Sequence, residues 1–189
     1  DKNPGLTEPV RGGGTAGPYL PAATDNRSNT IMSYHDASTT KRVIALGDGR
    51  FTTESVNPDS LQSLDVRALQ YLYGAAQTSD AATYTFEPDE VFSRTIWNPN
   101  AGSAIDLSNQ TKNNVVDLRA GRKSSIAIRD PYADTGMTAA AYAQRTALKS
   151  ALGVPTYSGS GNLSIAAGSH FTVAVGGSGN DSFIANKEG

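Results

Sequence analysis

The sequence predicts a mainly β chain with two helices, in which a β-sandwich leads into a parallel β-roll. Three observations support this fold class. Several short β-prone runs lie between residues 82 and 128, two longer runs have helical patterns, and a nine-residue repeat follows near the C-terminus. The segments between them are rich in glycine, proline, serine and asparagine, as turns and loops are.

The N-terminal part is expected to hold an arm, a short apolar patch and a hairpin. Residues 1–30 are expected to be extended, because they are rich in proline and glycine and have neither helical nor strand periodicity. The patch NTIMSYHD (29–36) carries one of the two methionines and one of the two histidines of the chain. After it, residues 39–56 form two β-prone pieces around Gly47-Asp48-Gly49, which predicts a hairpin.

Two runs predict helices. In PDSLQSLDVRALQYLYG (58–74), Ser60 or Ser63 is the expected N-cap and Gly74 the expected C-cap. Its apolar side chains recur at helical spacing, a pattern typical of a core helix: Leu64, Ala68, Leu69, Leu72 and Tyr73. The second run, MTAAAYAQRTALKSALG (137–153), is rich in alanine and has a narrow apolar face. We therefore expect it to lie on the surface of the strand region.

The strand region and the repeat follow different patterns. The β-prone runs are ATYTF, EVFSRTIW, SAIDLS, NVVDLRA and SSIAI. Further on, Gly-Ser pairs at 159, 168 and 177 recur every nine residues, and GGSGNDSFI (176–184) fits the pattern G-G-x-G-x-D-x-U-x, with U a large apolar residue. Repeats of this form build a parallel β-roll. The structural alternative is a Gly/Ser/Asn loop that ends a sandwich.

The turn of such a roll directs carbonyl oxygens and a carboxylate at Ca²⁺, an ion that prefers oxygen ligands. We therefore expect Gly177, Gly179, Asn180 and Asp181 to bind calcium, with the following Phe183 in the core. One turn supplies half of the oxygen cage, and the other half is expected from the block two repeats away. The block at 159–167 has Leu163 where the later block has Asp181, which argues against a complete site between these two.

Composition excludes several classes of partner and site. The formal net charge of −2 provides no basic field for nucleic acid or for an anionic membrane. There is no cysteine, which excludes disulfides, thiolate metal sites and cysteine nucleophiles. No apolar run approaches the length of about 18 residues that a membrane span needs, and the first residues lack the pattern of a signal peptide. We expect no nucleic-acid partner and no membrane span.

Four segments together resemble the serralysin-type secreted metalloproteases, a metzincin family with RTX calcium-binding relatives. NTIMSYH resembles their Met-turn, LQSLDVRALQYLYG the helix after it, IWNPNAGSAIDLSNQTKNNVVDLRAG the first sandwich segment, and NLSIAAGSHFTVAVGGSGNDSFIAN the start of the β-roll. The resemblance covers most of residues 20–128 and 158–186, in the family's order. It implies that residues 1–78 are the C-terminal part of a metzincin-like protease lobe. Residues 79–189 would then be a sandwich or RTX β-roll domain, with a helical insertion at 129–157.

The resemblance also implies roles for individual residues. Met32 would form the apolar floor beneath a catalytic zinc ion, and Tyr34 would approach the metal and the oxyanion of the transition state. In the first sandwich segment, the family's calcium ligands have Asn98 and Asp106 as their remaining counterparts.

The zinc ligands of the family come from a helix with the motif H-E-x-x-H-x-x-G-x-x-H, and this chain has no such motif. Its only histidines are His35 and His170, so the chain cannot assemble three histidine ligands from itself. Two explanations stay open. Asn3 of the triplet KNP stands in the place of a lost ligand, or the chain starts just after the ligands. A bound Zn²⁺ is expected only if the motif exists upstream.

Two functions therefore compete. The first is the C-terminal portion of a secreted, calcium-stabilised zinc endopeptidase that cleaves protein or peptide substrates and is inactive without the missing segment. The second is a non-catalytic extracellular RTX calcium-binding module with a degenerate protease scaffold, which binds a cell-surface or matrix partner. The resemblance implies type I secretion, and the expected location is extracellular or at the cell surface. A carbohydrate-binding sandwich is less well supported, because Trp97 is the sole tryptophan.

Overall fold

The computed structural model describes residues 20–37, 40–45, 51–77, 80–128, 138–152 and 157–187. Within these ranges the chain is mainly β with two helices, as the sequence predicts. The strands are β1 (Lys41–Ala45), β2 (Phe51–Ser55), β3 (Thr83–Thr85), β4 (Arg94–Ile96), β5 (Ser103–Asp106), β6 (Asn113–Asp117), β7 (Lys123–Ile128), β8 (Leu163–Ile165), β9 (Phe171–Val175) and β10 (Ser182–Ile184). The helices are α1 (Ser63–Tyr73) and α2 (Ala139–Leu152).

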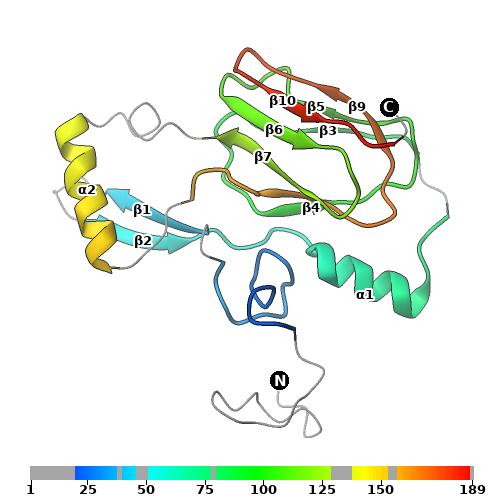
Figure 1. Ribbon diagram of the computed structural model, residues 1–189, viewed down its shortest axis with the longest axis horizontal. Helices are drawn as coiled ribbons and strands as arrows, with labels where there is room; N and C mark the ends of the chain where they lie inside the picture. Colours follow the sequence, from blue (N-terminus) through cyan, green and yellow to red (C-terminus); the bar gives the residue numbers. More distant parts are fainter. Residues whose placement is uncertain are drawn as a thin grey trace, which may run out of the picture.

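Two sheets pack face to face around the main core (Figure 1). One has five strands in the order β10-β6-β7-β8-β4, and the other has three in the order β3-β5-β9. Side chains from both sheets and from their loops form one apolar cluster: Phe86, Phe92, Ile96, Ile105, Leu107, Val116, Leu118, Ile126, Ala127, Leu163, Ile165 and Phe171. Along β5, buried positions alternate with partly buried ones, as a strand in a two-layer sandwich requires.

The three repeat blocks carry β8, β9 and β10, which alternate between the two sheets. They do not pair with one another. Each pairs in parallel with an earlier strand: β8 with β4, β9 with β5 and β10 with β6. Strand β7 lies antiparallel to both β6 and β8, so β6 and β7 separate β8 from β10. The expectation that the last turn faces the block at 159–167 is therefore wrong, and its neighbour is the segment before β6.

The hairpin prediction is confirmed for its strands. β1 and β2 are antiparallel, with Lys41 opposite Ser55 and Ala45 opposite Phe51. The predicted turn at Gly47-Asp48-Gly49 lies outside the described residues.

Helix α1 has the predicted span but not the predicted burial. It ends at Gly74, whose φ of +80° is the left-handed region that glycine adopts without strain. Its N-cap is Gln62, not Ser60 or Ser63. No residue of α1 is buried, and Leu72 and Tyr73 are 66% and 81% exposed. The helical spacing of its apolar residues is real, but the sandwich does not cover them, so the core-helix expectation is wrong.

Helix α2 lies beside the β1–β2 hairpin instead of on the strand region, which corrects the second helix expectation (Figure 1). Its Arg145 is buried, and this burial lowers the pKa of the guanidinium, with a smaller lowering from the like charge of Arg42 in β1. After the helix, the backbone N–H of Tyr157 donates to the carbonyl of Lys41 at 2.5 Å. Neither helix in the described part of the chain is of a length and hydrophobicity suited to crossing a bilayer.

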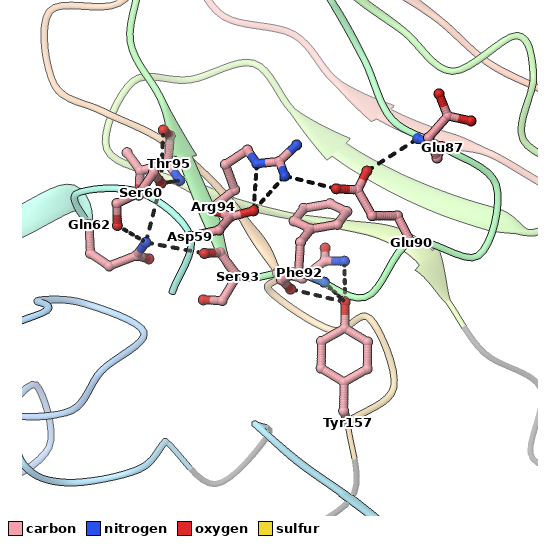
Figure 2. Close-up of polar contacts among 11 residues, drawn as sticks. Asp59, Ser60, Gln62, Glu87, Glu90, Phe92, Ser93, Arg94, Thr95 and Tyr157 are labelled. Carbon is pink, nitrogen blue, oxygen red and sulfur yellow. Dashed lines mark hydrogen bonds and ion pairs between the residues drawn. The ribbon is translucent and has the colours of Figure 1, made fainter. Parts of the chain in front are cut away.

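A polar joint connects the segment before α1 to β4 (Figure 2). The guanidinium of Arg94 donates through Nε to Asp59 at 2.9 Å and through Nη2 to Glu90 at 2.8 Å. It also lies 5.1 Å from the ring centre of Phe92. The two acidic partners raise the pKa of Arg94, chiefly through the hydrogen bond with Asp59. The joint therefore fixes the chain on the N-terminal side of the proposed boundary at residue 78 to the sandwich.

Side chains of the same segment satisfy the outer edge of β4. The Ser60 hydroxyl accepts from the backbone N–H of Thr95 at 2.9 Å, and the Gln62 amide donates to the carbonyl of Ser93 at 3.3 Å. On the other side, the Tyr157 hydroxyl donates to the carbonyl of Phe92 at 3.1 Å. These bonds close the edge strand, which would otherwise present unpaired backbone groups to water or to another chain.

Candidate functional site

The Met-containing segment is held by one carboxylate of α1. Asp65 accepts from the hydroxyl of Thr30 at 2.5 Å and from the backbone N–H of Ile31 at 2.9 Å. It also accepts from the backbone N–H of Gln62 at 2.8 Å, which satisfies a free donor at the start of α1. A backbone bond from Leu64 to Asn29, of 3.0 Å, reinforces the contact. The segment 29–33 and the N-terminus of α1 are thereby one rigid unit.

Met32 in this unit and Tyr34 just after it have exposed side chains. Met32 is 76% exposed and Tyr34 is 82% exposed. By contrast, Ser33 between them and Thr30 before them are buried. Met32 and Tyr34 line one open pocket of about 340 Å³, together with Arg27, Ile31, Ser33, Asn57 and Pro58. Met32 and Tyr34, for which the resemblance implies roles beside a zinc ion, thus line the same pocket. Their roles beneath a zinc ion stay predictions.

The polar side of the pocket is a small charge network. Arg27 donates to the Asn57 side chain at 3.1 Å and lies 3.5 Å from a carboxylate oxygen of Asp36, which also pairs with Lys41 at 3.2 Å. His35 Nε2 lies 3.7 Å from Asp25, with about half of the imidazole exposed. Among the residues that line the pocket, Arg27 carries the charge, and Asp36 pairs with it.

The described residues do not fit a zinc site. They contain no group of three or more histidine, aspartate or glutamate side chains placed to hold a metal ion. His35 and His170 belong to separate regions, since the backbone N–H of His170 donates to Asn98 beside the sandwich. Asn3 lies outside the described residues. No catalytic step is therefore assigned to zinc held by this part of the chain.

The predicted calcium turn packs closely on the segment that precedes β6. A Cβ atom on Gly177 would lie 2.0 Å from the carbonyl oxygen of Gln110, and one on Gly179 would lie 2.3 Å from that of Lys112. Any side chain at these positions would overlap backbone atoms. The glycines of the repeat are needed here because two backbone segments approach each other, not because of a positive φ.

Asp181 joins these two segments. Its Oδ1 accepts from both the backbone N–H and the side-chain amide of Asn114, at 2.9 and 2.7 Å. Its Oδ2 accepts from the backbone N–H of Gly177 at 2.8 Å. Next to it, the backbone N–H of Asn180 donates to the side-chain oxygen of Asn113 at 2.9 Å. The carboxylate of Asp181, which the sequence predicts to bind calcium, therefore accepts hydrogen bonds from N–H groups.

These donors do not fit a complete calcium site. An ionised carboxylate has about four acceptor positions, and three of those on Asp181 are taken by N–H groups. Calcium takes about 6 to 8 oxygen ligands, and the described part of the chain has no group of three or more histidine, aspartate or glutamate side chains placed to hold a metal ion. We therefore derive no chemistry from a calcium ion at this turn.

Asn98 and Asp106 serve separate turns. The side-chain oxygen of Asn98 accepts from the backbone N–H of Asn100 at 2.8 Å, and its amide donates to the carbonyl of Asp80 at 3.1 Å. Asp106 accepts from the backbone N–H of Ser108 at 2.9 Å, and this bond lowers the pKa of the carboxyl. Both residues have local structural partners, and neither is linked to Asp181.

Comparisons with known proteins add no family. No family model and no curated protein matches the chain. The residues that organise the two regions, Asp65 and Asn114, were not singled out from the sequence. Asp65 had a signal, since it is an acidic residue in the first turn of a helix, where carboxylates often accept N–H groups. Asn114 had none, because its partner lies 67 residues further along the chain.

Proposed function

We propose that this chain is the C-terminal portion of a secreted, serralysin-like zinc metalloendopeptidase. The single observation that carries the proposal is the turn fastened to Asp65, whose Met32 lines an open pocket together with Tyr34. In this proposal the turn is one wall of a cleft whose metal-binding helix belongs to a preceding part of the parent protein. The ordered resemblance of four sequence segments supports the same assignment.

The exposed apolar side chains around the turn support a surface that another part of the parent protein covers. Exposed apolar side chains scattered singly are ordinary, but contiguous ones mark contact surfaces. Here Ile31 and Met32 in the turn and Tyr34 just after it are all exposed. Nearby α1 has no buried residue in spite of its leucines and tyrosines. A face of this kind is suited to pack against another part of a protease lobe.

Met32 and Tyr34 would then each have one role in the cleft. Met32 would supply apolar packing, and the hydroxyl of Tyr34 would donate a hydrogen bond to an oxyanion in the cleft. The pocket beside Tyr34 would receive part of a peptide substrate. The chain itself supplies neither the metal ligands nor the general base.

The test uses the complete parent protein. We expect cleavage of casein that is abolished by a zinc chelator and restored by zinc. Tyr34→Phe should lower kcat by about 10²-fold, the cost of losing one oxyanion donor. Tyr71→Phe, which removes a hydroxyl from an exposed side chain of α1, is the matched control and should leave the rate unchanged. A parent protein without chelator-sensitive cleavage would exclude this proposal.

The second candidate is a non-catalytic extracellular module that binds a cell-surface or matrix partner. It is favoured by the lack of a metal-holding group among the described residues and by the exposed apolar side chains Val173, Val175, Phe183 and Ile184 on β9 and β10. The parent sequence upstream of Asp1 separates the two. An intact H-E-x-x-H motif there would reject the second candidate, and a broken motif would reject the first.

Both candidate functions include a calcium ion at the turn that contains Asp181, and for both the ligands available there are few. Since Asp181 has one acceptor position left, an ion at this turn would depend on further oxygens from Gly177, Gly179 and Asn180. A calcium titration of the chain, followed by circular dichroism, tests this part separately from proteolysis.

A further inference from the structure

We propose that Asp181 is a metal-independent latch that fastens β10 to the sandwich. The residue type and spacing predict a calcium ligand, but the geometry uses the carboxylate differently. All three of its hydrogen bonds come from N–H groups. Two of them come from Asn114 in β6 and connect that strand to the turn before β10, and the third, from Gly177, lies within the turn. The inference concerns the stability of the C-terminal strand and does not depend on the proposed proteolytic function.

The latch matters because β10 is an exposed strand at the edge of the five-stranded sheet. All three of its residues are exposed, and its one neighbour in the five-stranded sheet is β6. Phe183 is opposite the buried Val116 in the register but is itself 45% exposed, so the expectation that it lies in the core is wrong. Apolar burial therefore stabilises this strand only weakly. Hydrogen bonds to a charged acceptor are the stronger kind, and here three of them converge on one carboxylate.

The partner of Asp181 is itself fixed from two other directions. Asn114 is fully buried, its amide also donates to the carbonyl of Lys112 at 3.0 Å, and its side-chain oxygen accepts from the backbone N–H of Ala127 at 2.7 Å. The amide therefore points its remaining N–H at Asp181 in a set orientation. A preorganised donor reduces the entropy lost when β10 docks. The latch thus has the rigidity that a bound ion would otherwise supply.

The hydrogen bond from the backbone N–H of Leu118 to the carbonyl of Ile184, of 2.9 Å, reports on this docking. If β10 detaches, the Leu118 amide loses its acceptor and exchanges with solvent. Hydrogen exchange of this amide, measured by NMR in the 189-residue chain, is therefore the readout. Each protein is measured in a calcium chelator and again in millimolar Ca²⁺.

For the unmodified chain we expect the same protection of Leu118 in both solutions. Asp181→Asn should lower it about 10- to 100-fold in both, as expected for lost hydrogen bonds to a charged group. The new amide cannot replace the carboxylate in either of its two flip orientations, because its NH₂ group then faces an N–H donor. Asn114→Asp should also lower protection in chelator, since it sets a second carboxylate against Asp181. Glu87→Gln, which removes a charge from an exposed loop, is the control and should change nothing.

Two results would overturn the latch. One is a rise in Leu118 protection of the unmodified chain by about tenfold or more on adding Ca²⁺, the response of a native state that binds the ion. The other is wild-type protection of Leu118 in Asp181→Asn. If that variant does not fold, the comparison of the unmodified chain in the two solutions decides alone. Absence of zinc-dependent proteolysis in the parent protein would leave these results unchanged.

Discussion

The carboxylate of Asp65 accepts a hydrogen bond of 2.5 Å from the hydroxyl of Thr30, a residue 35 positions earlier in the chain. The same carboxylate holds the backbone N–H of Ile31 and that of Gln62, at 2.9 and 2.8 Å. One side chain thus caps the start of α1 and shapes the turn that displays Met32. Two features with separate sequence signals, a helix start and an apolar patch, are in fact one structural unit.

This arrangement predicts that Asp65→Asn loosens the Met-containing turn. The amide keeps one acceptor but turns an NH₂ group toward a donor, so a loss of about 1–3 kcal/mol in the free energy of unfolding is expected. The measurement is urea denaturation, combined with limited proteolysis of residues 29–36. Arg67→Gln removes a charge from an exposed position of the same helix and serves as the control. Equal denaturation midpoints for the two variants would show that Asp65 does not hold the turn.

A second prediction concerns Arg94 at the joint between the pre-α1 segment and β4. Arg94→Lys keeps the charge but loses the planar fork that reaches Asp59 and Glu90 and stacks near Phe92. Because Arg94 is about one-third exposed, solvent screening limits the expected loss to about 1 kcal/mol. Thermal unfolding should show a lower midpoint for Arg94→Lys than for Arg67→Lys. An unchanged midpoint would mean that the charge alone, without the fork geometry, is sufficient.

The parts of the fold that depend on residues close together in the sequence were predictable from it. Periodicity gave the extent of α1, and β-branched runs gave the strands from β3 to β7. The helical spacing of Leu69 and Leu72 defines a face but not the element that covers it, so the burial of α1 could not be derived. Strand partners posed the same difficulty, because the nine-residue repeat resembles a self-stacking roll while β8, β9 and β10 pair with β4, β5 and β6.

The candidate sites show the same limit. The motif GGSGND predicted a glycine-dependent turn with an important aspartate, and the structure gives both features a use. It could not predict that Asn114, 67 positions earlier, would supply the donors for that aspartate. Ligand-type residues in a pattern therefore indicate where a carboxylate is needed. Only the partner that the fold brings to it decides between an ion and N–H groups.

Gly177 gives a third prediction, about close backbone approach. Gly177→Ala should be strongly destabilising, by about 3 kcal/mol or more, because the methyl group would overlap the carbonyl of Gln110 and the two segments must separate. Gly121 is the matched control. Its φ is +78° and nothing lies within 4 Å of an added Cβ, so Gly121→Ala should cost only about 1–2 kcal/mol of left-handed strain. Chemical denaturation compares the two. A larger loss at Gly121 would show that the approach at Gly177 is looser than described.

The last prediction concerns acid stability and Asp117, a buried residue at the end of β6. Its carboxylate accepts from Arg119 Nη2 at 2.7 Å and Nε at 2.9 Å, and the hydrogen bonds with Arg119 are the main cause that lowers the pKa of Asp117. A folded-state pKa below the ordinary value of about 3.9 means that the unfolded chain takes up the proton first as the pH falls. The stabilisation is therefore complete above that value and is lost as the pH falls through the lowered pKa.

Arg119→Met removes the donor side chain and leaves the buried carboxyl in place. Unfolding free energies measured between about pH 6 and pH 2, a range that spans the ordinary aspartate pKa, should fall less steeply for the variant than for the unmodified chain. The two curves should approach each other at the acid end, because protonated Asp117 no longer distinguishes them. Arg67→Met, at an exposed position without this partner, should reproduce the unmodified slope. Parallel curves for the Arg119 variant and the unmodified chain would mean that Arg119 is not what keeps Asp117 ionised.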